Sequence, residues 1–358
     1  MIESRPAQEP AASEPPEPPE PPERDRKAEH IALALEERMQ VRRGAFDRLA
    51  FEHCALPEID MEEIDTSCEL LGKRLGAPLL VSSMTGGTGE AARINRHLAE
   101  AAEERRIAIA VGSQRKAIED PVTAASFEVR RYAPTVPVLG NLGAVQLNYG
   151  FGVEHCRGAL EMIGADALVL HLNPLQEAIQ PEGQTRFARL LPRIAEIVDG
   201  LGAPVVVKEI GSGLSEPVGR ELQRVGVRIL DTAGVGGTSW ARIEAARADD
   251  FDIGELFADW GIPTPDSIRA LARIPGIQVI GSGGIRHGLD VAKAIALGAD
   301  LTGMAYRFLG PARQSAAAVV EKIDRTVREL KIAMFCVGAR NLAELRRAPL
   351  RDVWEPAP

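Results

Sequence analysis

Four polar residues stand close together directly after the short apolar run ALVL. They are His171, Asn173, Gln176 and Glu177, all within the stretch HLNPLQEAIQPEGQT. Glu177 could hold Mg²⁺, which takes few protein carboxylates and shares phosphate oxygens with its substrate. His171 and Asn173 could orient that substrate or the waters on the metal. The alternative is a helix N-cap network in which Asn173 precedes Pro174 at the first helical position.

Glycine clusters follow several other apolar runs. Two of these clusters follow consecutive apolar runs near the end of the chain, GSGGIRHG (281–288) and GADLTGMA (298–305). The first precedes a helix-like segment. Glycine amides and a helix N-terminus in such a pair can bind a phosphate group, since the absence of Cβ lets the ligand approach the backbone. EIGSGLS (209–215) and AGVGGTS (233–239) would add further amide donors. Glycine also makes loops flexible, so a single cluster is a weak signal.

Several cations and one amide could meet an anionic ligand. Lys208 ends the apolar run PVVV, where a buried lysine is costly unless it meets an anion. Either a structural ion pair or an anionic cofactor ring would satisfy it. Asn141 could hydrogen-bond the same ring or cap a turn. Arg26, Lys27 and Arg115 suit a diphosphate, although a solvated charged face would also explain them.

Eight apolar runs recur along the chain and would position these residues. They span 78–84, 107–112, 136–142, 167–173, 204–210, 227–233, 277–283 and 299–305. Each is typical of a strand of a parallel sheet that is buried on both faces, and helix-like segments alternate with them. The pattern predicts βαβ units closed into a (β/α)₈ barrel, with a doubly wound open sheet as the alternative. In a barrel the polar residues after each run would meet at the carboxyl ends of the strands.

The remaining composition limits the class of protein. The chain has 358 residues, is 45% hydrophobic and carries a net charge of −9 without a basic patch, which argues against nucleic-acid binding. Its four cysteines show no CxxC spacing, which argues against zinc and a disulfide framework. No signal peptide or membrane-length apolar run is present, so a cytoplasmic location is expected.

Two segments differ from the barrel pattern. Residues 1–24 are rich in Pro and Glu and predict a disordered or polyproline-like tail, ahead of a single domain over 25–358. The stretch from about 234 to 277 is unusually long for one barrel connection. It is a candidate lid, or a short helix with a packing loop.

Taken together, these motifs resemble the FMN-dependent, type 2 isopentenyl-diphosphate isomerases. The matching segments include RKAEHI, MTGGTGEAARIN, VGSQRKA, HLNPLQEAIQPEGQ, VKEIGSGLS and DTAGVGGTSWARIE, in family order between about residues 26 and 310. The resemblance implies interconversion of isopentenyl and dimethylallyl diphosphate without net redox change. It also implies bound FMN kept reduced by NADPH, Mg²⁺ on the diphosphate, and a homo-oligomer.

The resemblance further implies a role for individual residues. Gln176 would lie on the substrate side opposite the flavin and assist proton transfer, Glu177 would ligate Mg²⁺, and Trp240 would close over the site. The residues expected around the diphosphate are Arg26, Lys27, His30, Arg115, His171, Asn173 and Gln176. Those expected to bind FMN are Ser83, Met84, Thr85, Gly86, Ser113, Asn141, Lys208, Ser212, Thr238, Gly283, Gly284 and Ala305.

Three rival functions are weighed against this one. A 2-hydroxy-acid oxidase would need a histidine after the sixth strand, where the chain reads DTAGVGGTSW. An enzyme like IMP dehydrogenase would need a cysteine in that loop, but none occurs between Cys156 and Cys336. A flavin-binding protein without catalysis would bind FMN but show no turnover, and the intact pair Gln176–Glu177 argues against it.

Deleting residues 1–22 should leave isomerase turnover unchanged, because no matched motif lies in the Pro/Glu-rich tail. Steady-state assays of the full-length and shortened proteins check this. A large loss of activity on deletion would show that the tail contributes to the site.

Overall fold

The computed structural model describes residues 26–41 and 44–353. The tail predicted over residues 1–24 lies outside the described residues, as does the side chain of Arg26.

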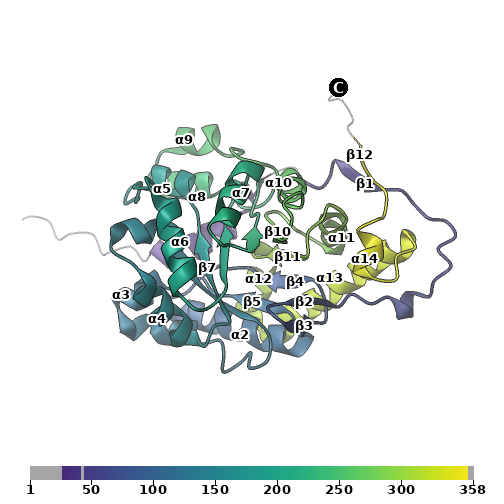
Figure 1. Ribbon diagram of the computed structural model, residues 1–358, viewed down its shortest axis with the longest axis horizontal. Coiled ribbons are helices and arrows are strands. Elements are labelled where there is room, and N and C mark those ends of the chain that lie inside the picture. The colour runs from purple at the N-terminus through teal and green to yellow at the C-terminus, as the bar shows by residue number, and fades with distance from the viewer. Residues whose placement is uncertain (1–25, 42–43, 354–358) are drawn as a thin grey trace, which may run out of the picture.

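Eight parallel strands close into a barrel with the order β10-β11-β4-β5-β6-β7-β8-β9 (Figure 1). Each strand coincides with one of the eight apolar runs, which confirms the predicted (β/α)₈ barrel, and the alternative of an open sheet is wrong. The barrel strands are β4 (Leu79–Val81), β5 (Ala108–Ala110), β6 (Val138–Gly143), β7 (Ala167–His171), β8 (Val205–Lys208), β9 (Ile229–Asp231), β10 (Gln278–Ser282) and β11 (Leu301–Met304).

The strands are apolar throughout because both of their faces are buried. Along β7, Ala167 and Val169 belong to the cluster that fills the barrel, whereas Leu168 and Leu170 pack with the surrounding helices. This alternation is the one expected when successive side chains point to opposite faces of a strand. Burying both faces therefore fixes the register, and with it the side on which each polar strand end emerges.

Helices cover the outside of the barrel. Among the helices that alternate with the barrel strands are α2 (Gly89–Arg105), α4 (Val153–Ile163) and α11 (Gly288–Ala296), as the helix-like segments of the sequence predict. The side chain of Thr88 caps α2 by accepting a hydrogen bond from the Ala91 amide at 3.1 Å. The other helices are α1 (Arg26–Ala34), α3 (Arg115–Glu119), α5 (Pro174–Ile179), α6 (Leu190–Gly200), α7 (Glu216–Arg224), α8 (Trp240–Arg247), α9 (Phe251–Leu256), α10 (Thr264–Leu271), α12 (Tyr306–Gln314), α13 (Ala316–Cys336) and α14 (Leu342–Leu345).

The long segment between β9 and β10 is mostly helical. It contains α8 and α9 as an additional helical pair, followed by α10, which packs against β10 as a barrel helix. The two expected alternatives were a lid and a short helix with a packing loop. The structure shows two short helices rather than one, and α8 carries Trp240 beside the barrel opening. That this segment acts as a lid stays a prediction.

Two small sheets lie outside the barrel. Strands β1 (Leu49–Phe51) and β12 (Leu350–Asp352) pair antiparallel, and β2 (Cys68–Leu70) forms a hairpin with β3 (Lys73–Leu75). Leu70 and Leu75 of the hairpin are fully buried and join the cluster inside the barrel. The hairpin therefore closes the amino-terminal end of the barrel and leaves the carboxyl end for the site.

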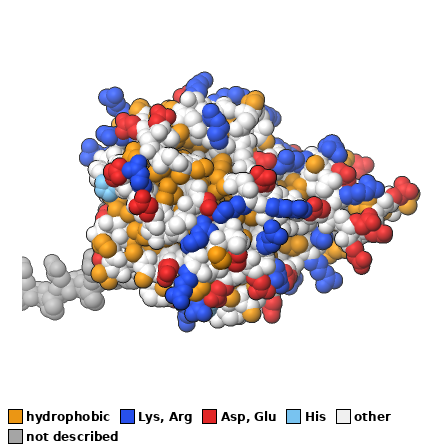
Figure 2. Space-filling model, turned by 60° about the horizontal axis from the view of Figure 1, so that its bottom comes forward, with side chains coloured by type: hydrophobic (Ala, Val, Ile, Leu, Met, Phe, Trp, Pro, Cys, Tyr) orange, Lys and Arg blue, Asp and Glu red, His pale blue; other side chains and the backbone are white. Residues whose placement is uncertain are grey.

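The surface carries charges of both signs. On the face shown in Figure 2, Lys and Arg side chains are interspersed with Asp and Glu, in agreement with the dispersed basic residues of the sequence. Within residues 26–41 and 44–353, no helix has both the length and the apolar character needed to cross a membrane.

Asp166 ties the hairpin to the amino-terminal end of β7. Its carboxylate accepts hydrogen bonds from Lys73 Nζ at 2.7 Å, Arg130 Nη2 at 2.7 Å and the Val138 amide at 2.8 Å. Burial alone would raise the pKa of Asp166, but these three donors outweigh burial and hold the pKa below its usual 3.8.

Asp166→Asn should lower the free energy of unfolding by about 1–2 kcal/mol at pH 7, since the lost contacts are charge-assisted but partly screened by solvent. A depressed folded-state pKa stabilises the protein above pH 3.8, and this contribution is lost as the pH falls through the folded-state value. The difference between wild type and variant should therefore shrink below pH 3.8.

Urea unfolding at several pH values measures this difference. Asp324→Asn, which removes an ion pair between more exposed side chains, is the matched control and should cost less. An equal cost for both substitutions at pH 7 would contradict the role of Asp166.

Candidate active site

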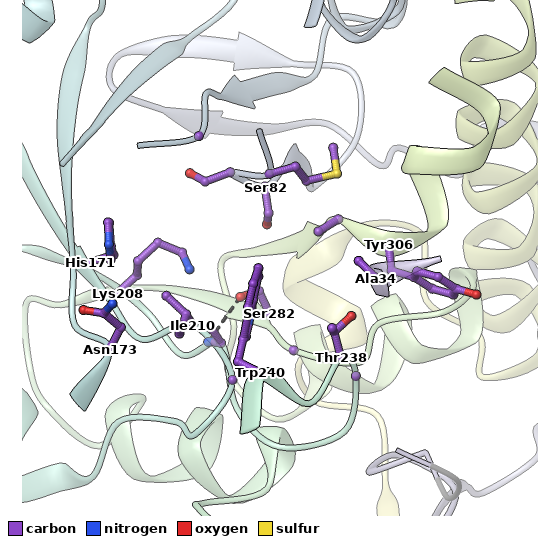
Figure 3. A pocket seen from close by; sticks show the side chains of 18 of the residues that line it. Ala34, Ser82, His171, Asn173, Lys208, Ile210, Thr238, Trp240, Ser282 and Tyr306 are labelled. Carbon is purple, nitrogen blue, oxygen red and sulfur yellow. Dashed lines mark hydrogen bonds between the residues drawn. The ribbon is translucent and has the colours of Figure 1, made fainter. Parts of the chain in front are cut away.

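A single large cavity of about 420 Å³ opens at the carboxyl ends of the barrel strands (Figure 3). This volume is in the range of small-molecule sites, roughly 300–1,000 Å³. The cavity brings together most residues that were expected to bind cofactor, substrate or metal. The expected residues that line it are Lys27, His30, Ser83, Met84, Thr85, Ser113, Arg115, Asn141, His171, Asn173, Gln176, Glu177, Lys208, Thr238, Gly283, Gly284 and Ala305.

Three expected residues are placed differently. Gly86 does not line the cavity, and a Cβ there would lie 1.9 Å from the ring of Phe127, so its glycine is explained by packing. Ser212 lies beside a smaller neighbouring cavity. Arg26 begins α1, but its side chain is outside the described part of the chain.

The backbone amides after β8 do not face the cavity as free phosphate donors. The amides of Ile210, Gly211 and Ser212 all donate to one carboxylate oxygen of Glu209, at 2.5–2.6 Å. Glu209 is only 4% exposed, and its carboxylate thus occupies the place that an external anion would take. The expectation that EIGSGLS supplies phosphate-binding amides is wrong for this reason.

Three strand ends are joined by a chain of side-chain hydrogen bonds. Asn141 Nδ2 donates to Ser83 Oγ at 2.8 Å, and Asn141 Oδ1 lies 2.8 Å from His171 Nδ1. Because an amide oxygen only accepts, His171 must carry its proton on Nδ1, which leaves Nε2 as an acceptor. The alternative in which Asn141 merely caps a turn is not what the structure shows.

A buried row of ionisable groups crosses the next strands. His171 pairs in register with Lys208, and Lys208 with Asp231. Burial, and then the charge of Lys208, lowers the pKa of His171 to about 3, so the imidazole is neutral at pH 7. Burial raises the pKa of Asp231, although Lys208 and Ser282 oppose this rise. In Figure 3, His171, Asn173 and Lys208 lie together on one side of the cavity.

Lys208 itself is 7% exposed, and its ammonium donates to the backbone carbonyl of Glu209 rather than to a carboxylate. Of the two explanations for a lysine at this strand end, a closed structural ion pair is not formed. Its side chain lines the cavity and would place a positive charge beside an anionic ligand.

Helix α5 presents the polar cluster that follows β7. Asn173 occupies the N-cap position and Pro174 the first helical position, yet the Asn173 side chain makes no capping hydrogen bond. Its Nδ2 donates instead to Gln176 Oε1 at 3.0 Å and to Glu177 Oε1 at 2.8 Å. Its Oδ1 is buried and has no hydrogen-bond partner among the described residues. The alternative of a simple N-cap network is therefore wrong, and the free Oδ1 is available to a ligand.

Glu177 offers one carboxylate to the cavity. Its Oε2 accepts from Gln180 Nε2 at 3.0 Å and from the Gln184 amide at 2.7 Å. Among the described residues, no group of three or more His, Cys, Asp or Glu side chains could hold a metal by itself. This donor set fits Mg²⁺ only as an ion that shares ligands with a substrate phosphate and water.

Arg115 is linked to the Glu177 carboxylate by hydrogen bonds through Gln184. Its Nη1 donates to Gln184 Oε1 at 3.2 Å, and Gln146 Nε2 donates to that oxygen at 2.6 Å. The backbone amide of Gln184 in turn holds Glu177. Arg115 and Glu177 are thus positioned by one glutamine, Gln184, which sequence reasoning did not identify.

Glu244 is a further residue that sequence reasoning missed. It lies on α8, its side chain is fully buried, and its Oε1 accepts from Gln176 Nε2 at 2.6 Å and lies 3.0 Å from His30 Nε2. Burial would raise the pKa of Glu244, but the contacts with His30, Gln176 and Arg247 outweigh it and hold the pKa low. The Gln176 amide is therefore fixed at both ends, by Asn173 and by Glu244.

Two glycines and two unpaired hydroxyls of the cavity bear on the expected FMN. Gly283 and Gly284 have φ angles of +100° and +76°, and a Cβ on either would lie 2.2 Å from a backbone oxygen. Only glycine suits both positions, because the loop after β9 packs against them, and both line the cavity, where their backbone can meet a ligand phosphate. Ser82 Oγ and Thr85 Oγ1 are buried without a hydrogen-bond partner within the described ranges. These residues fit a bound flavin nucleotide.

The amino-terminal segment covers one side of the cavity. Lys27 Nζ donates to the Ser113 carbonyl at 3.2 Å and lies 5.0 Å from the centre of the Phe127 ring. His30 packs edge-on against Trp240, with ring centroids 5.3 Å apart. Further along, the Val41 amide donates to the Gly237 carbonyl at 2.8 Å. The start of the chain is thus joined to the loop after β9 across the opening.

Other cavity residues were not identified from the sequence. They are small or lie beyond the strand ends, where neither residue type nor spacing distinguishes them. They include Gln40, Gly112, Gln146, Gln180, Ile210, Gly303, Tyr306 and Arg307.

Known proteins resemble this chain at two levels. The sequence profile of the family described as FMN-dependent dehydrogenase matches residues 29–134 and 262–352, more than half of the chain. Among solved structures, a mandelate oxidase variant superposes with a TM-score of 0.59 at 17% identity, covering 90% of this chain and 92% of that one. A putative lactate oxidase from Pediococcus acidilactici gives 0.63 at 14% identity, covering 93% and 88%. At these identities the structural likeness concerns the barrel fold alone.

Curated relatives are much more similar in sequence. A protein from Paracoccus zeaxanthinifaciens named isopentenyl-diphosphate delta-isomerase is 51% identical over 332 residues, covering 90% of this chain and 95% of the relative. One of the same name from a Nostoc species is 48% identical over 331 residues, covering 90% and 94%. With this identity over nearly the whole barrel, the chain belongs to the type 2 isopentenyl-diphosphate delta-isomerase family, on the fold of the FMN-dependent dehydrogenases.

Proposed function

We propose that this protein interconverts isopentenyl and dimethylallyl diphosphate, with FMN kept reduced by NADPH and with Mg²⁺ on the diphosphate. One observation carries the proposal: the Gln176 amide is locked between Asn173 and Glu244 at the wall of a cavity suited to a flavin, beside the single carboxylate of Glu177. Such a site can hold an alkene diphosphate without offering the histidine base that a 2-hydroxy-acid oxidase would need.

The diphosphate would bind between α1 and α5. Lys27, Arg115, His30, Asn173 and Glu177 all line the cavity, and Asn173 Oδ1 has no hydrogen-bond partner among the described residues. Cations neutralise the phosphate oxygens, and Mg²⁺ would share those oxygens with the carboxylate of Glu177. The polar end of the substrate is thereby fixed, and its hydrocarbon end is directed toward the barrel axis.

The proton shift would take place over the barrel opening. When bound, reduced FMN would supply the acid–base group that this chemistry needs. Gln176 is held so that its amide faces the cavity and can orient the alkene or a water, while Trp240 and α1 exclude bulk water. His171 stays neutral and hydrogen-bonds the substrate or Asn141 rather than exchanging a proton at pH 7.

A 2-hydroxy-acid oxidase is the competing function, because the solved structural neighbours include such enzymes. The loop after β9 contributes Ala233, Gly234, Gly236, Gly237 and Thr238 to the cavity, without a histidine. His171, on β7, has a pKa near 3 and would be a poor general base at neutral pH. These features favour the isomerase. Homo-oligomerisation stays a prediction from the resemblance, and a cytoplasmic location stays a prediction from the sequence.

The proposal is tested by anaerobic incubation of the purified protein with FMN, NADPH, Mg²⁺ and isopentenyl diphosphate. Proton NMR should show dimethylallyl diphosphate accumulating until the two isomers reach equilibrium. Omission of FMN from the apoprotein should abolish the reaction. A protein that binds and reduces FMN but forms no dimethylallyl diphosphate would contradict the proposal.

Glu177→Gln should raise the KM for isopentenyl diphosphate by about ten-fold or more at limiting Mg²⁺, because the substitution removes the charge that attracts the shared metal. FMN binding, followed by flavin absorbance, should not change. The exposed Glu196→Gln on α6 is the control. An unaltered dependence of the rate on Mg²⁺ in Glu177→Gln would remove Glu177 from the metal site.

A further inference from the structure

Helix α1 carries four residues of the cavity, Lys27, His30, Ile31 and Ala34, but has little hydrophobic attachment of its own. Ile31 is the buried apolar side chain that the structure describes on this helix. Helices of this length are marginal unless other elements hold them in place. Polar contacts to neighbouring elements must therefore keep α1 over the site.

Most of these contacts are made by residues on one face of α8. Trp240, Glu244 and Arg247 are spaced by four and three residues, which places them on the same side of a helix. Trp240 contacts the His30 ring, Glu244 lies 3.0 Å from His30 Nε2, and Arg247 Nε donates to Glu29 Oε2 at 3.2 Å. This face of α8 is thus the surface on which α1 rests.

Arg247 makes contacts that no other residue on this face makes. Its Nη1 donates to Glu244 Oε2 at 2.7 Å, and its Nη2 donates to Glu182 Oε1 at 2.9 Å. Glu182 lies in the segment that follows α5, the helix that carries Gln176 and Glu177. One guanidinium therefore joins α1, α8 and the segment after α5, and its side chain is only 12% exposed.

The charges around Arg247 are unbalanced, because negative groups outnumber the single positive one. Three carboxylates, those of Glu29, Glu182 and Glu244, converge on one cation, and Glu244 is fully buried. Removing the cation would leave like charges facing each other across the joint between α1 and α8. We expect the exposed helix α1 to move away first, because α8 is anchored through the buried residues Ala241, Ile243 and Ala245.

We propose that Arg247 is a positioning residue that clasps α1 over the site, so that Lys27 and His30 meet the diphosphate. Arg247 itself does not line the cavity and would act through the elements it joins. The inference rests on the proposed function for its substrate, while the clasp can be measured without turnover.

The first measurement is hydrogen–deuterium exchange of the FMN-loaded protein. In Arg247→Gln, the α1 amides that are protected in the wild type should exchange about ten-fold faster or more, and the amides of β7 and β8 should not change. Arg220→Gln, which breaks the ion pair of Arg220 with Glu216 on the distant α7, is the matched control and should leave α1 unchanged. Unaltered exchange of α1 in Arg247→Gln would overturn the clasp.

The second measurement is steady-state kinetics with isopentenyl diphosphate. Arg247→Gln should raise KM by about ten-fold or more, with kcat within about three-fold and FMN affinity within about two-fold of wild type. Arg247→Lys should recover part of the loss, and Glu29→Gln should reduce the loss caused by Arg247→Gln, because it removes one of the carboxylates left facing each other. Equal losses in kcat, KM and FMN affinity would indicate general misfolding and overturn the positioning role.

The two measurements separate the inference from the proposed function. A wild-type protein without isomerase turnover whose α1 is released by Arg247→Gln contradicts the proposed function and keeps the clasp. A wild-type isomerase whose KM and α1 exchange are both unaffected by Arg247→Gln contradicts the clasp and keeps the function.

Discussion

The buried charge of Lys208 organises the carboxyl end of the barrel. The register of the parallel strands places it between His171 and Asp231, and its charge depresses the pKa of His171 while it opposes the rise in the pKa of Asp231. A cation so poorly hydrated needs anions nearby. Lys208 forms no closed ion pair, so one more anion can bind beside its ammonium group. Burial, reinforced by this charge, keeps the imidazole neutral, and the charge itself accounts for the anionic ligand expected of this cavity.

On the substrate side, hydrogen bonds between amides and carboxylates hold the side chains in place. Gln176 is held between Asn173 and Glu244, and Glu177 is held by Asn173, Gln180 and the Gln184 amide. Burying an amide group costs little free energy when it is hydrogen-bonded to a partner. Amides also do not compete with a cofactor for protons. Such a cavity wall suits a proton transfer without net redox change, because the acid and the base can both come from the cofactor.

Most of the fold could be predicted from the sequence, because burial on both faces makes every barrel strand apolar and a polar residue marks where it ends. The same logic found most of the cavity wall. It failed at Glu209, whose carboxylate binds its own backbone amides, and at Gly86, whose glycine is needed by Phe127. A residue type alone does not tell whether an anion-binding loop is already filled.

Glu244 and Arg247 could not be identified because they lie on a helix outside the alternating barrel pattern and act through tertiary contacts. Their spacing from Trp240 in WARIEAAR does place the three on one helical face, which was the available signal. Without the position of α1, that face looks like an ordinary charged surface. The clasp becomes visible only when the amino-terminal segment is placed over the barrel.

The ratio of NADPH oxidised to dimethylallyl diphosphate formed tests the central claim most directly. It should be measured anaerobically over many turnovers of the FMN-loaded protein. The structure, with its neutral His171 and no histidine after β9 among the residues lining the cavity, predicts a ratio far below one, because reduction only prepares the flavin. A ratio of one NADPH for each product would show that electrons are consumed in every cycle and would contradict a redox-neutral isomerase.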